Sequence, residues 1–211
     1  TKAIGVIMPS STNIALQNPF FPEILRGIGS VIHEAEYSMY LSTGETEVEI
    51  LSEVQRMVYG SYVDGVILLY SRINDKVTSF LREQGFPFVI VGKPDDFDTE
   101  ITHVDNDNFK AGKEITQHLI DMGHERIGFI GGSRDLFVTR DRESGYVAAL
   151  QEAGIEDCEP YKIHTEFLKS GGREAVEHLM SLAIPPTGLV VSDDLISLGI
   201  LSMLENYGIR I

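Results

Sequence analysis

Arg140 and Arg142 are the residues best suited to binding a small polar ligand. They occur in "TRDRESGY", on a predicted loop that enters a helix, in a chain with 17 Lys and Arg against 32 Asp and Glu. A guanidinium carries five N–H donors in a fixed fork, and with a carboxylate acceptor opposite it can bind vicinal hydroxyls. The alternative for Arg142 is a surface ion pair with Asp141 or Glu143. Both interpretations stay open at this stage.

Two pairs of aspartates offer the matching acceptors. "VVSDDLISLG" places Asp193 and Asp194 between a buried strand and a helix, so one can cap the helix while the other faces a ligand. A divalent cation needs several convergent oxygens, and neither pair has a histidine or a third carboxylate at matching spacing. For Asp105 and Asp107 the sequence favours the end of a strand and the cap of a helix that begins near Phe109. No metal site is predicted.

Two adjacent phenylalanines, Phe20 and Phe21, end an otherwise polar loop in "PSSTNIALQNPFFPEILRGI". A sugar has an apolar C–H face and a hydroxylated rim, so its site combines aromatic rings with polar groups. The alternative is a hydrophobic contact at the helix entrance. Phe21 shares the apolar phase of the helix, which favours the core for that ring and the ligand for Phe20.

Cofactor and catalytic motifs are not matched. "GFIGGS" follows a strand but lacks the G-x-G-x-x-G spacing and the Gly-Lys-Ser/Thr ending of a phosphate-binding loop. The six histidines form no i, i+4 pair, G-x-S-x-G is absent, and Cys158 lies in an acidic loop that would raise its pKa. We therefore expect no cofactor and no enzymatic activity.

Composition limits the possible partners. The formal net charge of −15 repels phosphate backbones and anionic membranes, so these residues alone would bind DNA poorly. No apolar run approaches the roughly 20 residues of a membrane span, and the chain opens directly on a strand-like segment instead of a signal sequence. One cysteine allows no intrachain disulfide. These features are compatible with a cytoplasmic protein.

The elements that must position these residues alternate along the chain. Amphipathic helical phases, such as those over residues 21–32, 50–58, 111–122, 146–153 and 196–207, separate short apolar runs. The runs that read as buried strands are Ile4–Met8, Ser38–Leu41, Val66–Tyr70, Phe88–Val91, Ile127–Ile130, Tyr161–His164 and Leu189–Val191. This alternation predicts an α/β fold of doubly wound parallel sheets, with functional loops at the carboxyl ends of the strands. The acidic, non-helical stretch Gly92–Asn108 predicts a passage between two lobes, residues 1–100 and 101–211, and hence a cleft.

Seven segments in order resemble the effector-binding domain of the lactose-repressor/galactose-repressor (LacI/GalR) family of bacterial transcription regulators. They are "GVIMP", "NPFFPEILRGI", "VDGVIL", "VDNDNFKAG", "HLIDMGHERIGFIGG", "DRESGYVAAL" and "VVSDDLISLGIL", and the match runs from Lys2 to the last residue. The resemblance implies two lobes of the type I periplasmic-binding-protein fold around a sugar or purine. "VGKPDD" with "SDDLIS" resembles the maltose-type regulators of the family.

The resemblance also implies roles for individual residues. The family's ligand contacts match Phe20, Phe21, Tyr70, Arg142, Phe167 and Asp193, and a dimer contact matches the helix of Leu198. Asp193 stands where asparagine is commoner, which favours a ligand rich in hydroxyl donors over an anionic one. Gly92 stands where the family often has an aspartate, so one hydroxyl acceptor is missing.

The expected function, by this resemblance, is sugar-controlled binding of operator DNA by a homodimer. The DNA-binding headpiece and the C-terminal part of such a regulator would lie outside this chain. Ligand closure would rotate the lobes and change operator affinity. The alternative is a periplasmic sugar-binding receptor of an ABC transporter, which would use the same fold and cleft as a monomer.

Overall fold

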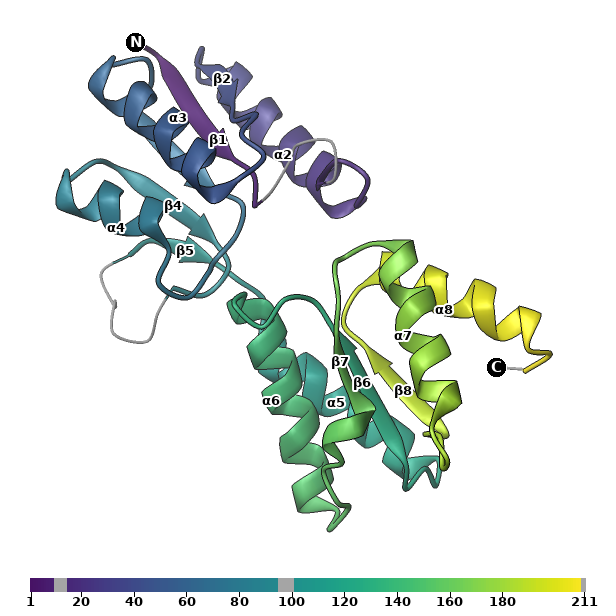
Figure 1. Cartoon of the computed structure of the whole chain (residues 1–211). Coiled ribbons are helices and arrows are strands. Elements are labelled where there is room, and N and C mark those ends of the chain that lie inside the picture. Colours follow the sequence, from purple (N-terminus) through teal and green to yellow (C-terminus); the bar gives the residue numbers. More distant parts are fainter. Residues whose placement is uncertain (10–14, 95–100, 210–211) are drawn as a thin grey trace. The chain divides into compact units, whose positions relative to one another are not determined.

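The structure, a computed structural model, describes residues 1–9, 15–94 and 101–209 (Figure 1). The chain divides into two units, Thr1–Asp105 and Asn106–Ile211, which we call lobe 1 and lobe 2. The division falls after Asp105 instead of after residue 100, where the sequence placed it. The reason is a short strand at His103–Val104, which pairs with the preceding strand of lobe 1.

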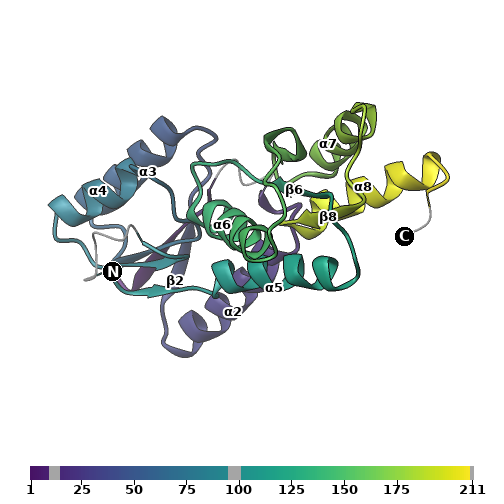
Figure 2. The same ribbon diagram turned by 90° about the horizontal axis from the view of Figure 1, so that it is seen from below.

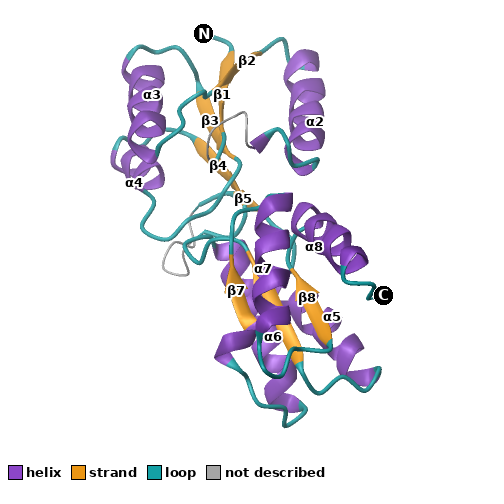
Figure 3. Cartoon of the chain, turned by 45° about the vertical axis from the view of Figure 1, so that its right-hand side comes forward, coloured by secondary structure: helices purple, strands orange, loops and turns teal. Residues whose placement is uncertain are grey.

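Lobe 1 is a five-stranded sheet with strand order β2-β1-β3-β4-β5, and all its pairings are parallel. The strands are β1 (Ala3–Ile7), β2 (Ser38–Leu41), β3 (Gly65–Leu68), β4 (Phe88–Val91) and β5 (His103–Val104). Helix α2 (Phe20–Glu34) covers one face, while α3 (Glu47–Tyr59) and α4 (Lys76–Glu83) cover the other (Figure 3). This is the arrangement that right-handed crossovers produce in a doubly wound sheet.

Each face of the lobe 1 sheet has its own hydrophobic core. On the α2 side, Phe21, Ile24 and Ile28 pack against buried strand residues such as Val6. On the other side, Val54 and other apolar residues of α3 and α4 pack against β1, β3 and β4. The first turn of α3 is stabilised by a capping box, in which the side chains of Thr46 and Glu49 each accept a hydrogen bond from the other's backbone N–H.

Lobe 2 repeats this arrangement with the parallel strand order β7-β6-β8. Its elements are α5 (Asn108–Asp121), β6 (Ile127–Gly131), α6 (Phe137–Glu152), a 3-10 turn (Glu159–Tyr161), β7 (Lys162–His164), α7 (Lys169–Ser181), β8 (Gly188–Val191) and α8 (Asp194–Asn206). Helices α5 and α6 lie together on one face, and α7 and α8 lie on the other (Figures 1 and 2).

Glycines allow the helices of lobe 2 to pack in close pairs. A Cβ atom at Gly145 of α6 would lie 2.0 Å from the Phe109 carbonyl oxygen of α5, and one at Gly112 of α5 would lie 2.2 Å from the Arg142 carbonyl oxygen. Gly172 and Gly199 produce the same close approach between α7 and α8. Backbone therefore contacts backbone at both crossings, and a larger residue at any of the four positions would force the helices apart.

The predicted fold class is confirmed, and the strands lie within about a residue or two of their predicted bounds, the usual disagreement at strand ends. Two predictions were wrong or incomplete. Arg140 and Arg142 lie on α6 itself, which begins at Phe137, instead of on a loop before it. The short elements α4 and β5 were not predicted, since eight and two residues carry too little periodicity to be recognised.

Candidate functional site

Both sheets contain a point at which the chain connections change direction. In lobe 1 it lies between the neighbouring strands β1 and β3, and in lobe 2 between β6 and β8. The helices that follow the two strands leave toward opposite faces, which is the arrangement in which doubly wound folds place a ligand beyond the carboxyl ends of the strands. Ligands bind at this edge in open α/β sheets, so the predicted site residues of each lobe are expected there.

In lobe 2, Arg142 lies at the carboxyl-terminal edge of the sheet and is held by two acceptors. Its Nε donates to Oδ1 of Asn108 at 2.9 Å, and its Nη1 donates to the backbone oxygen of Ser192. Asn108 begins α5 and Ser192 follows β8, so the guanidinium connects three elements that are distant in sequence. These two hydrogen bonds hold the half-buried side chain in one orientation.

The position of Asn108 follows from local sequence and from helix packing. Asp107 caps α5, because its Oδ1 accepts a hydrogen bond from the backbone N–H of Lys110 at 2.9 Å, as the sequence predicted. Asn108 is 3% exposed, and its buried Oδ1 has the Arg142 guanidinium as its donor. The close contact of α5 with α6 brings the two side chains into this range.

Asp193 lies beside this guanidinium bridge as the N-cap of α8. Its Oδ1 accepts from the backbone N–H groups of Leu195 at 2.8 Å and Ile196 at 3.2 Å. The next residue, Asp194, is exposed in the first turn of the helix. Asp193, which the resemblance implied as a ligand contact, therefore also caps α8. The sequence alone could not assign which of the two aspartates forms the cap.

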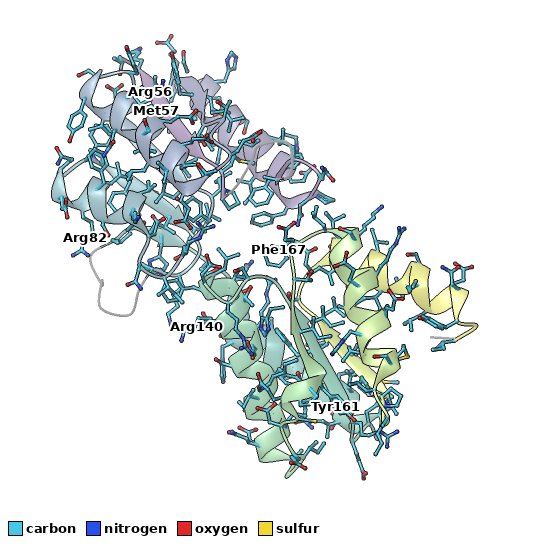
Figure 4. The ribbon with its side chains drawn as sticks, in the orientation of Figure 1. Arg56, Met57, Arg82, Arg140, Tyr161 and Phe167 are labelled. Carbon is cyan, nitrogen blue, oxygen red and sulfur yellow. The ribbon has the colours of Figure 1, made fainter. Side chains whose placement is uncertain are left out.

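Phe167 is placed at the same edge of lobe 2. A Cβ atom on Gly132, just after β6, would lie 2.2 Å from the Phe167 ring, so the ring lies directly against that glycine. The ring also packs against the hydrophobic cluster between the sheet and helices α7 and α8. Figure 4 shows Phe167 at the end of lobe 2 where α7 begins.

In lobe 1, Phe20 and Phe21 occupy the first turn of α2. Phe21 packs against the α2-side core, as its helical phase predicted, whereas Phe20 is 47% exposed. The two rings contact edge to face, with centroids 5.2 Å apart. Oδ1 of Asn18 accepts a hydrogen bond from the Phe20 backbone N–H at 3.0 Å and so helps to fix the start of the helix. Phe21 thus supports an exposed aromatic ring at Phe20.

Tyr70, which the resemblance implied as a ligand contact, is buried. Its side chain belongs to the core of lobe 1 and is 7% exposed. Burial raises the pKa of the phenol, and so does the nearby Asp75 carboxylate, to which the hydroxyl donates at 3.3 Å. The guanidinium carbon of Arg72 lies 5.5 Å from the ring centroid.

Gly92, where the resemblance implied an aspartate in the family, has a backbone conformation that disfavours any side chain. Its φ of +124° is a conformation that side chains rarely adopt, and a Cβ atom would lie 3.0 Å from Cβ of Ser71. The Ser71 hydroxyl donates to the backbone oxygen of Lys93. In this conformation the turn after β4 therefore excludes a carboxylate side chain at Gly92.

Several residues at these edges were not among the predicted contacts. Asn108 and the Ser192 carbonyl hold Arg142, and Arg72 with Glu47 lies at the edge of lobe 1. The sequence placed Asn108 just before a predicted helix, but no local pattern indicated that its amide reaches Arg142, 34 residues away along the chain. No sequence signal identifies a backbone carbonyl as an acceptor.

The residues that the structure describes contain no group of three or more His, Cys, Asp or Glu side chains that could hold a metal ion. Within the same residues, no helix combines the length and the apolar character needed to span a bilayer. Leu198, the predicted dimer contact, is 48% exposed on α8, and Leu201 one turn later is 44% exposed.

Comparison with known proteins gives consistent matches over the whole chain. The family model described as periplasmic binding proteins and sugar binding domain of LacI family matches residues 1–211. The HTH-type transcriptional regulator MalR of Streptococcus pneumoniae is 37% identical over 208 residues, which are 98% of this chain and 63% of that protein. This chain thus spans less than two thirds of that regulator's length.

Two solved structures are similar throughout. A LacI-type transcriptional regulator from Bacillus cereus subsp. cytotoxis is 51% identical with a TM-score of 0.98, covering 100% of this chain and 75% of that chain. A complex of the transcriptional regulator CelR with cellobiose is 30% identical with a TM-score of 0.88, covering 100% of this chain and 64% of that chain.

Proposed function

Because the chain belongs to the family of periplasmic binding proteins and LacI-type sugar-binding domains, we propose that it binds a neutral sugar that controls a transcription regulator. The observation that supports this most directly is the fixed guanidinium of Arg142. Its contacts to Asn108 and Ser192 hold it beside Asp193 at the edge where doubly wound folds bind ligands. Fixed donors beside a carboxylate suit a ligand with vicinal hydroxyls.

We propose that each lobe also has an aromatic ring that can contribute to sugar binding. Phe20 of lobe 1 is exposed and supported by Phe21, and Phe167 of lobe 2 lies against Gly132. Rings at such positions can contact the apolar C–H face of a pyranose. The ring of Tyr70 is buried. In this proposal it contributes to the site by packing beneath the edge of lobe 1.

The class of sugar proposed is a glucose disaccharide. The regulator MalR is a relative over nearly all of this chain, and the related CelR was solved with cellobiose. Asp193 as an acceptor favours neutral hydroxyl donors over anions. Maltose is our first candidate, with cellobiose as the second.

The proposal extends to the rest of the regulator. In this proposal, operator DNA is bound by a helix-turn-helix headpiece, since the acidic charge of this chain disfavours DNA.

We also propose that Leu198 and Leu201 on α8 contribute to a homodimer interface and that the protein is cytoplasmic. Sedimentation equilibrium of the full-length protein tests the dimer, and a monomer at micromolar concentration would refute it. The relatives named as transcriptional regulators favour this proposal over the periplasmic receptor.

Calorimetric titration of the full-length protein tests sugar binding. The panel is maltose, maltodextrins, cellobiose, sucrose, galactose, ribose and purines. Arg142→Ala removes charge-assisted hydrogen bonds and is expected to weaken binding by at least about 1.5 kcal/mol, roughly ten-fold in Kd. Of the two arginines in "TRDRESGY", Arg140 is exposed on the same helix (Figure 4), so Arg140→Ala is the matched control, for which we expect little change. Unchanged affinity of the Arg142 variant would remove this residue from the site.

A further inference from the structure

The most informative contacts outside the predicted site surround Arg72, in the loop that follows β3 of lobe 1. Its side chain is 16% exposed, although arginine is usually a surface residue. One Nη1–H donates to a carboxylate oxygen of Glu47 in the first turn of α3, and Nη2 donates to the backbone oxygen of Pro9 at 3.2 Å. The guanidinium carbon lies 5.5 Å from the centroid of the Tyr70 ring. Arg72 therefore connects the ends of β1 and β3 with the start of α3.

These contacts cross the point where the connections of lobe 1 change direction. Pro9 follows β1, Arg72 follows β3, and the two strands are neighbours in the sheet. Helix α2 leaves β1 toward one face, and α4 leaves β3 toward the other, so the loops after these strands diverge here. The hydrogen bond from Arg72 to Pro9 holds the two diverging loops together.

Lobe 2 contains an equivalent hydrogen bond at the corresponding point of its own sheet. There Nη1 of Arg142, on the helix that follows β6, donates to the backbone oxygen of Ser192, which follows β8. Strands β6 and β8 are the neighbours at the corresponding point of the order β7-β6-β8. In each lobe a half-buried arginine therefore donates to a backbone carbonyl that follows the neighbouring strand at this point.

The charge around Arg72 suits an uncharged ligand. The Glu47 carboxylate, whose side chain is 59% exposed, neutralises the guanidinium at the edge of the lobe. The pair presents donors and acceptors without net charge, which matches hydroxyl groups better than it matches a phosphate or carboxylate.

We propose that Arg72 is a positioning residue for sugar binding at this edge of lobe 1. It acts through the Pro9 carbonyl and the Tyr70 ring, whose relative placement it fixes, and Glu47 holds it in that orientation. Because affinity depends on groups that are already ordered before binding, loss of this bridge raises the cost of ordering the edge of lobe 1. This inference rests on the proposed function and extends it to a residue that was not among the predicted contacts.

The test uses the full-length protein titrated with maltose and with cellobiose by calorimetry. Arg72→Ala is expected to weaken the binding of the preferred sugar by about ten-fold or more, the usual range for losing a hydrogen-bonded charged group. Arg72→Lys keeps a cation beside Glu47 but not the fork that reaches Pro9, so its Kd should lie between those of wild type and Arg72→Ala. The control is Arg82→Ala on the exposed side of α4 in the same lobe, with a Kd expected within about two-fold of wild type.

Stability measurements separate positioning from a general effect on folding. Each variant is also unfolded by heat without ligand, and binding is measured well below the lowest midpoint, where all variants are folded. Glu47→Gln and the double variant with Arg72→Ala complete a cycle, in which the loss of affinity should be less than additive because both residues act through one bridge. If Arg72→Ala does not fold, the test relies on the Kd values of Arg72→Lys and Glu47→Gln alone.

The outcomes distinguish this inference from the proposed function. If wild type binds neither these two sugars nor another of the panel, the proposed function fails and this inference fails with it. If wild type binds a sugar and folded Arg72→Ala binds it within about two-fold, the usual scatter of a surface substitution, only this inference fails. Strictly additive losses of sugar affinity in Arg72→Ala and Glu47→Gln would also contradict the proposal that both residues act through one bridge.

Discussion

The contact between α5 and α6 gives the most stringent prediction about how the fold supports the site. In Gly145→Ala, the new methyl carbon would lie 2.0 Å from the Phe109 carbonyl oxygen and 2.7 Å from the Lys113 backbone nitrogen. A carbon and a carbonyl oxygen are normally at least about 3.3 Å apart, so the two helices must separate by roughly an ångström. Both clashing atoms belong to the backbone of α5, which cannot rotate away as a side chain would.

The expected cost follows from this separation. A gap of about an ångström forfeits a quarter to a half of the dispersion energy between the atoms that lose contact, and overpacking of this kind costs about 1–3 kcal/mol or more. The higher helix propensity of alanine returns about 1 kcal/mol. Because the clash is with backbone atoms, the overpacking cost should reach about 3 kcal/mol, the upper end of that range, so the expected net loss in the free energy of unfolding is about 2 kcal/mol. Sugar binding should weaken as well, because the hydrogen bond from Arg142 to Asn108 joins the same two helices.

The matched control is Gly27→Ala, the same substitution inside α2. A Cβ atom at Gly27 would have no other heavy atom within 4 Å, so the helix gains propensity without a clash, and stability should rise by about 0.5–1 kcal/mol. Urea unfolding followed by circular dichroism measures both variants. If Gly145→Ala is as stable as wild type, or if both variants shift in the same direction, the reasoning from the close helix contact is refuted.

Two further predictions concern the ends of secondary-structure elements. Asp193→Ala should lower the stability of lobe 2 by about 1 kcal/mol, because the cap of α8 is lost. Asp193→Asn should cost only a few tenths of a kcal/mol, because asparagine also caps helices. Equal free energies of unfolding for the two variants in urea would contradict the role of Asp193 as a cap. Hydrogen bonds from Lys162 and then Arg134 lower the pKa of Glu159. The ionised carboxylate is therefore favoured in the folded state, and its stabilising contribution is complete above the unfolded pKa of about 4.3 and is lost as the pH falls below it. Thermal midpoints measured from pH 6 to pH 3 should fall less steeply for Glu159→Gln than for wild type, and identical slopes would exclude this contribution.

Much of the architecture could be predicted from local patterns. Short β-branched runs separated by helical phases indicated parallel strands and amphipathic helices, because each element must bury one face. The helical phase of Phe21 indicated its place in the core, and the position of Asp107 before a helix indicated a cap. These predictions depend only on residues within a few positions of one another.

What the sequence did not determine depends on contacts between distant segments. The burial of Tyr70, the bond from Arg142 to the Ser192 carbonyl, and the bridge from Arg72 to Pro9 all join groups that strand order brings together. The sequence alone identified arginines and aspartates that could bind hydroxyl groups. Only the tertiary structure decided which of them are held in place, because a hydrogen bond forms when distance and orientation are both satisfied, and the packing of sheet and helices sets both.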